Sequence, residues 1–167
     1  MLINVIVVYL PLIKVQNNYR GLIMIKINYP EHTFKIKKEN DIELIFDAFR
    51  KRWFTLTPEE WVRQNILQYL TEIKKYPSTL IAIEKEIYLG ELKKRCDIVV
   101  YNRNSLPWMI IECKEMNVQI NSKVLEQILR YHITLPAKYL VITNGSYCLA
   151  FEKKEGQFYE TDEFPEY

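Results

Sequence analysis

The hydrophobic pattern of the chain is strand-like near its start and becomes helical further on. Residues 24–30 and 34–37 alternate apolar and polar positions, residues 42–46 alternate more loosely, and residues 53–56 form a further short candidate. Alternation of this kind is typical of strands, so we expect a small N-terminal β-meander. The apolar stretch at residues 2–15 is shorter than the roughly 20 residues that a membrane-spanning helix needs. It also lacks the basic start and the cleavage site of a signal peptide.

A helix is predicted to begin after Thr57, which can cap it and is followed by Pro58, Glu59 and Glu60. The glutamates suit the positive end of the helix dipole. Pro77 ends the segment. Apolar residues recur at helical spacing at Val62, Ile66, Leu70 and Ile73.

The remaining pattern alternates between strands and one more helix. Strands are expected at residues 80–89, 96–101, 108–114, 138–143 and 147–151. A helix is expected at residues 121–135, before Pro136, with one apolar face at Val124, Ile128, Tyr131 and Leu135. The acidic segment at residues 160–167 is expected to be exposed.

Charged residues interrupt two of the predicted core strands. Asp97 lies in one, and Glu112 and Lys114 lie at the end of the next. Side chains alternate along a strand, so Glu112 and Lys114 share a face while Cys113 points to the other. If the strands pair antiparallel, Asp97 lies opposite Glu112, and two carboxylates and an ammonium converge. That set suits a hard cation beside a lysine, as metal-assisted phosphodiester hydrolysis requires.

Composition bounds the class of protein. The 167 residues carry a net charge of +2 and are 49% hydrophobic, which indicates one globular domain. Three cysteines without CxxC spacing argue against a disulfide framework or a structural zinc site, and favour the reducing cytoplasm. The two histidines, His32 and His132, are too few for a His-rich metal site, and the sequence has no P-loop for ATP.

The predicted order from residue 58 onward is helix, three strands, helix, strand, and it resembles the PD-(D/E)xK nuclease core. The resemblance is carried by Asp97, by residues 112–114 (Glu-Cys-Lys) and by residues 127–131 (Gln-Ile-Leu-Arg-Tyr). The closer similarity is to the N-terminal nuclease domain of type I restriction enzyme R subunits. It includes residues 56–64, 94–101 and 141–145, and covers roughly residues 24–167. The implied fold is an α/β restriction-endonuclease-like core (αβββαβ), a mixed central sheet flanked by helices, with the small N-terminal β-meander added.

The resemblance implies a Mg²⁺-dependent DNA endonuclease of the restriction type, with Mn²⁺ as a substitute metal. Asp97, Glu112 and the backbone carbonyl of Cys113 would hold the metal. Lys114 would orient or help to deprotonate the attacking water and stabilise the transition state. The alternative is a structural ion pair of Glu112 with Arg95 or Lys114.

The resemblance also gives roles to residues on the two helices. One helical glutamate reaches towards the metal, and Glu59 fits slightly better than Glu60 because it shares a face with Val62. Plain capping is the alternative for both glutamates. Gln127 joins the catalytic network or contacts the nucleic-acid backbone, and Tyr131, one turn later, supports it. Tyr131 fits equally well as a core aromatic residue.

Arg95 and Lys94 are candidates to bind phosphate, with a solvated basic turn as the alternative. DNA is the expected substrate, and methyltransferase, specificity or translocase subunits are candidate partners. A non-catalytic DNA-binding or assembly module, and a repair or junction-resolving nuclease, are the rival functions. We divide the chain into residues 1–23, a leader that ends before a possible true start at Met24, and a nuclease-like domain at residues 24–167. Within it we expect a β-rich addition (24–56), a core (57–152) and a tail (153–167).

Overall fold

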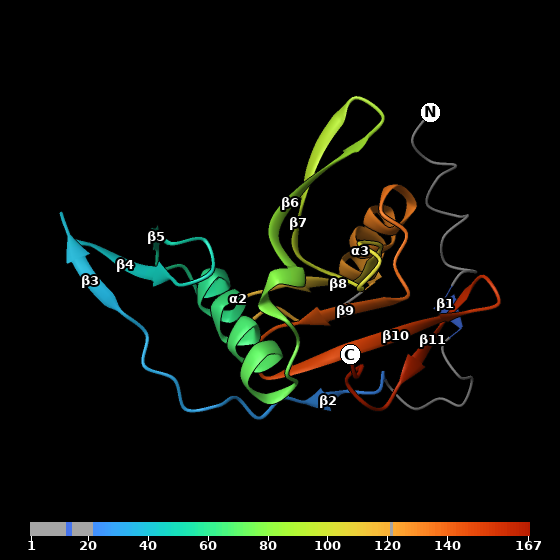
Figure 1. Cartoon of the computed structure of the whole chain (residues 1–167), viewed down its shortest axis with the longest axis horizontal. Coiled ribbons are helices and arrows are strands. Elements are labelled where there is room, and N and C mark those ends of the chain that lie inside the picture. The colour runs from blue at the N-terminus through green and yellow to red at the C-terminus, as the bar shows by residue number, and fades with distance from the viewer. Residues whose placement is uncertain (1–12, 15–21, 121) are drawn as a thin grey trace.

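A large mixed sheet forms the centre of the computed structural model, which describes residues 13–14, 22–120 and 122–167 (Figure 1). The predicted apolar leader therefore lies outside the described residues except for Ile13 and Lys14. The sheet has eight strands, in the order β1-β11-β10-β9-β8-β7-β6, with β2 paired to β10 off this path. Its strands are β1 (Ile13–Lys14), β2 (Ile25–Lys26), β6 (Ile81–Leu89), β7 (Leu92–Tyr101), β8 (Pro107–Cys113), β9 (Tyr139–Thr143), β10 (Tyr147–Lys154) and β11 (Gln157–Thr161).

Parallel pairing occurs at two places in this sheet, and both join segments far apart in sequence. β8 pairs with β9 in parallel across the crossover that contains α3 (Ser122–Thr134), and β1 pairs with β11 in parallel. The other pairs are antiparallel. The domain is therefore a mixed α/β fold.

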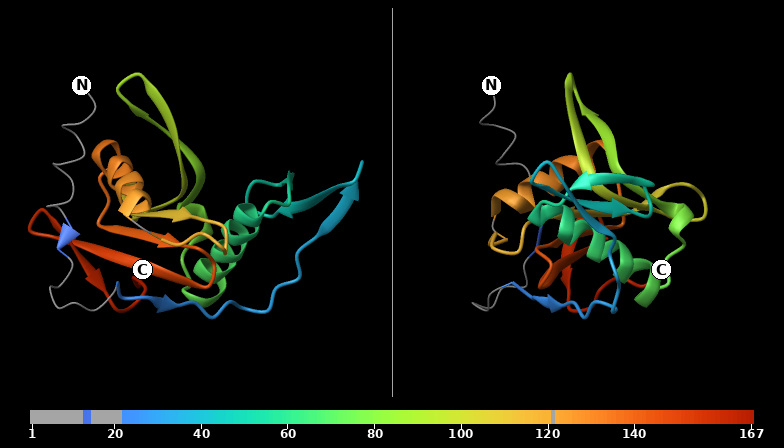
Figure 2. Two further views of the ribbon diagram at one scale, coloured as in Figure 1. Left: turned by 180° about the vertical axis from the view of Figure 1, so that it is seen from behind. Right: turned by 90° about the vertical axis from the view of Figure 1, so that its left-hand side faces the viewer.

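The predicted N-terminal meander is smaller than we expected. A separate three-stranded sheet is formed by β3 (Ile36–Glu39), β4 (Ile42–Asp47) and β5 (Arg52–Thr55). β2, expected to belong to it, pairs with β10 of the large sheet instead. Figure 2 shows the small sheet and the β6–β7 hairpin projecting from the body in different directions.

The first predicted helix consists of α2 (Pro58–Gln68) continued by a π-helical turn (Tyr69–Ile73), and a short 3-10 helix (Ser78–Leu80) leads into β6. Thr57 caps α2 as predicted, because its Oγ1 accepts a hydrogen bond from the backbone N–H of Glu60 at 3.1 Å. Val62, Ile66 and Leu70 are buried, whereas Ile73, predicted for the same face, is 48% exposed. The π-helical turn rotates the last residues away from the regular helical spacing.

The two helices cover opposite faces of the sheet. Along β8, Met109, Ile111 and Cys113 pack in the cluster that contains the apolar residues of α2, whereas Ile110 packs in the cluster that contains those of α3. The ends of β7 and β8 therefore lie between α2 and α3. No helix in the described ranges is long and apolar enough to cross a membrane.

The C-terminal segment is only in part the exposed acidic tail that we predicted: its acidic residues at positions 162, 163 and 166 are exposed, but the apolar residues 164 and 165 are buried. Phe164 is buried in the core, where its ring meets Tyr69, and Tyr76 donates a hydrogen bond to the carbonyl of Pro165. Tyr167 contacts the ring of Tyr76. Burial of these apolar residues fastens the segment to the core while its carboxylates stay in solvent.

Candidate active site

β7 and β8 pair antiparallel, which is the condition under which we expected Asp97 to lie opposite Glu112. Ile98 pairs with Ile111, so Asp97 and Glu112 occupy the next positions of the two strands. The alternation of side chains breaks at Asp97, because Cys96 packs on the α3 side of the sheet while Ile98 packs on the α2 side. On β6, opposite this break, Glu84 has a left-handed backbone conformation (φ +53°). The irregularity turns Asp97 towards α2, as bulges near functional sites commonly do.

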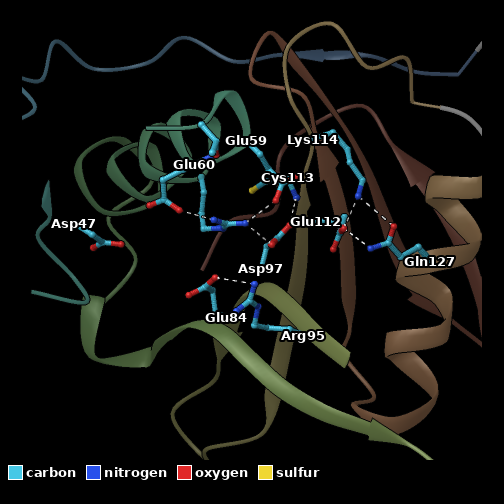
Figure 3. Close-up of polar contacts among 12 residues, drawn as sticks. Asp47, Glu59, Glu60, Glu84, Arg95, Asp97, Glu112, Cys113, Lys114 and Gln127 are labelled. Carbon is cyan, nitrogen blue, oxygen red and sulfur yellow. Dashed lines mark hydrogen bonds and ion pairs between the residues drawn. The ribbon is translucent and has the colours of Figure 1, made fainter. Parts of the chain in front are cut away.

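Glu112 is the centre of a hydrogen-bonded cluster between β8 and α3. Its Oε1 accepts from Lys114 Nζ at 2.8 Å and from Gln127 Nε2 at 2.5 Å. The Gln127 carbonyl oxygen accepts from Lys114 at 3.2 Å, and its amide lies 2.8 Å from the hydroxyl of Tyr131. Figure 3 shows Glu112 and Lys114 converging with Gln127 of the helix. The structure thus brings together four residues that we singled out from the sequence.

The carboxyl group of Glu112 is buried close to a second carboxylate, that of Asp97, and both conditions disfavour its ionised form. Burial, and then the nearby Asp97, raise the pKa of Glu112 to about 8. Its Oε2 atom is buried and has no hydrogen-bond partner. Burial alone would lower the pKa of Lys114, but the hydrogen bond and charge of Glu112 outweigh it and raise this pKa. Lys114 is therefore an ammonium at neutral pH.

Asp97 is held by two donors. Its Oδ2 accepts from the backbone N–H of Cys113 at 2.8 Å, and its Oδ1 accepts from Arg63 Nη2 at 2.8 Å. Burial disfavours the charged form of Arg63, but the charge of Asp97 outweighs that effect and the pKa of Arg63 is raised. The nitrogen Nε of Arg63 is buried without an acceptor.

The two helical glutamates differ in environment. Glu60 is buried and accepts hydrogen bonds from Arg50, from Arg63 Nη1 at 2.5 Å and from Gln64 at 2.8 Å. Glu59 is 46% exposed, and its recorded contact is with Arg63 Nη2, at 2.9 Å. Figure 3 shows Glu60 on the side of the cluster away from Glu112. The carboxylate of Glu60 is therefore fully engaged in structural hydrogen bonds. The carboxylate of Glu59 is partly open to solvent and can accept further hydrogen bonds.

Arg50 and the residues around it were not predicted as part of the site. The Arg50 side chain is only 11% exposed. It pairs with Asp47, Glu60 and Glu84, and its guanidinium lies 3.4 Å from the ring centre of Phe54. This cluster joins the small sheet to α2 and β6.

The two residues of β7 that we predicted to bind nucleic acid make no contact with the cluster around Glu112 among the ion pairs and hydrogen bonds of the described residues. Arg95 is 61% exposed and lies 3.3 Å from Glu84, whereas Lys94 is exposed on the hairpin. Arg95 therefore pairs with Glu84 and not with Glu112, the partner that we considered. Phosphate contact by either residue stays a prediction.

The residues around Glu112 fit a divalent cation by their donor chemistry. Two adjacent carboxylates and a buried oxygen without a partner are the hard oxygen ligands that Mg²⁺ takes. In the part of the chain that the structure describes, no three His, Cys, Asp or Glu side chains gather as a complete metal site. A cation here would depend on Asp97 and Glu112 together with backbone oxygen, water or substrate, which is common for Mg²⁺.

The fold and this site define an α/β domain with one carboxylate in the middle of the central strand β7 and a second carboxylate and a lysine at the end of the neighbouring strand β8. Residues 58–165 match the family model described as "Type I restriction enzyme R protein N terminus", and the chain belongs to that family. A crystal structure from Anabaena variabilis ATCC 29413, described as a "putative nuclease belonging to DUF820", is similar at 13% identity and a TM-score of 0.44. The similarity covers 76% of this chain and 80% of that one. A search of curated proteins gave no match.

Proposed function

We propose that the chain is a Mg²⁺-dependent nuclease domain of the restriction type that hydrolyses phosphodiester bonds in DNA. Its framework would be a restriction-endonuclease-like core, in which α2 precedes β6, β7 and β8 and α3 precedes β9. Membership of the R-protein family supports a nuclease role. It also supports assembly with methyltransferase, specificity or translocase subunits, and action in the cytoplasm.

One observation carries the proposal. Glu112 is buried beside Asp97 and keeps an oxygen without a partner, although Lys114 and Gln127 occupy its other oxygen. An unsatisfied buried carboxylate oxygen costs free energy, so a structural ion pair alone does not account for it. A bound divalent cation would satisfy that oxygen and offset the charge of both carboxylates.

The protein's own residues have distinct parts in this reaction. Asp97 and Glu112 would hold the cation, with the Cys113 carbonyl as a third candidate ligand. Lys114 is an ammonium, so it would act by orienting the attacking water and by stabilising charge on the phosphate, not by removing a proton. Gln127 touches both Glu112 and Lys114 and would fix their relative positions. The metal, when bound, would lower the pKa of the attacking water and offset charge on the scissile phosphate.

Cleavage of supercoiled plasmid tests the proposal. We expect nicking in Mg²⁺ or Mn²⁺, none in EDTA, and loss of nicking in Asp97→Ala and Lys114→Ala. Glu91→Gln is a matched control, because Glu91 is an exposed carboxylate at the tip of the β6–β7 hairpin. Binding of DNA without cutting in Mg²⁺, also with partner subunits present, would support the rival non-catalytic module and contradict the proposal.

A further inference from the structure

Arg63 is hydrogen-bonded to Asp97, one of the two carboxylates to which the proposed function gives a metal-binding role. Its Nη2 donates to Asp97 Oδ1 at 2.8 Å, and its side chain is only 7% exposed. Asp97 and Glu112 together place two carboxylates in the interior, and an unpaired buried charge is costly. Lys114 offsets the charge of Glu112, and Arg63 offsets the charge of Asp97.

Arg63 also contacts two glutamates of its own helix, and these would keep its charge paired if it moved away from Asp97. The nitrogen that binds Asp97 also lies 2.9 Å from Glu59, and the other terminal nitrogen lies 2.5 Å from Glu60. Both glutamates precede Arg63 by one turn of the same helix, so they stay within reach when the guanidinium moves. Arg63 could therefore release Asp97 without becoming an unpaired buried charge.

Asp97 would keep its orientation after such a release. Its second oxygen accepts from the backbone N–H of Cys113, which is fixed in β8. The released oxygen would then be free to bind a cation.

We infer that Arg63 is the resident counter-ion of Asp97, which pairs with that carboxylate in the metal-free protein and competes with a divalent cation for it. The inference rests on the proposed function, because it assumes that Asp97 binds metal. Arg63 is a positioning residue in this account, since it acts on the reaction only through Asp97.

Calcium affinity, measured by isothermal titration at pH 8 on the full chain, tests this competition. Removing a positive charge beside a cation site favours the cation, so Arg63→Met is expected to bind Ca²⁺ about tenfold or more tightly than the unmodified protein. The same variant is expected to reach its full rate of DNA cleavage at a lower Mg²⁺ concentration, because the competitor is gone and the backbone N–H of Cys113 still holds Asp97. A purely structural role would weaken binding and cleavage together.

Arg50→Met is the matched control. Arg50 is also a buried arginine that binds Glu60, but none of its recorded ion pairs includes Asp97. Its loss is expected to leave Ca²⁺ affinity unchanged or lower. Equal tightening in both variants, or unchanged or weaker Ca²⁺ binding in a folded Arg63→Met, would overturn the inference. No Ca²⁺ binding by the unmodified protein would instead contradict the proposed function, and the inference with it.

A measurement on the unmodified protein covers the case in which Arg63→Met does not fold. The Nε–H signal of Arg63 in the NMR spectrum is expected to shift on Ca²⁺ addition, while that of Arg50 stays in place. An unmoved Arg63 signal at a calcium concentration that saturates the site would overturn the inference.

Discussion

Replacing Glu112 with glutamine is expected to stabilise the metal-free protein at alkaline pH while it abolishes cleavage. The pKa of Glu112 is about 8 in the folded protein, against an ordinary value of 4.5. A raised carboxyl pKa means that the folded state holds its proton more tightly than the unfolded state. Stability from this group is therefore full below pH 4.5 and is lost as the pH rises from 4.5 to 8.

The size of this effect follows from the shift in pKa. At about 1.4 kcal/mol per unit, ionised Glu112 costs the folded protein about 4 kcal/mol at pH 8. Glutamine removes that cost but places an amide N–H₂ where the buried Oε2 has no partner, which offsets about 1–2 kcal/mol. We therefore expect Glu112→Gln to be more stable than the unmodified protein by about 2 kcal/mol at pH 8, and no more stable than it at pH 5.

Urea denaturation of both proteins in EDTA, at pH 5 and at pH 8, measures this difference. Its midpoint is expected to move up by about 1 M in the variant at pH 8. Ca²⁺ is expected to narrow the gap by stabilising only the protein that keeps the carboxylate. A variant that is less stable at pH 8, or a gap that does not change with pH, would refute the reasoning about buried charge at Glu112.

Three further predictions concern the rest of the fold. Burial, and then Lys153, lower the pKa of His132 to about 4 from 6.5, so this imidazole should by itself lower the stability of the protein by roughly 3 kcal/mol between pH 6.5 and 4, and the difference in stability between His132→Gln and the unmodified protein should change by that amount over this range. Phe164→Ala should lower the free energy of unfolding in urea by about 3–5 kcal/mol, while the exposed Glu163→Ala changes it by less than about 0.5 kcal/mol. Arg50→Met leaves three carboxylates without their shared cation and should cost about 3–5 kcal/mol by the same assay; an effect no larger than that of the exposed neighbour Lys51→Met would contradict this role.

Local patterns were enough to predict most of the elements near the site. The Thr57 cap and the spacing of Val62, Ile66 and Leu70 depend on neighbours one turn away, so both could be read from the sequence. The neighbouring positions of Asp97 and Glu112 followed from the antiparallel pairing of two short runs, but the break in alternation that turns Asp97 towards α2 did not.

Partners that are distant in the chain could not be predicted in this way. Arg63 lies in a segment that we had singled out, and its spacing from Glu59 and Glu60 was a usable signal, but its contact with Asp97 depends on how α2 packs on β7. The pairing of Arg50 with Glu84 depends in the same way on the docking of the small sheet.

The most direct test of the central claim is the position of a bound metal. A crystal grown with Mn²⁺ and measured at the manganese absorption edge should show an anomalous peak within about 2.3 Å of oxygens of both Asp97 and Glu112. The peak should disappear in Asp97→Ala crystals grown in the same way. A manganese peak elsewhere in a protein that cleaves DNA, or no peak at a saturating Mn²⁺ concentration, would contradict the account.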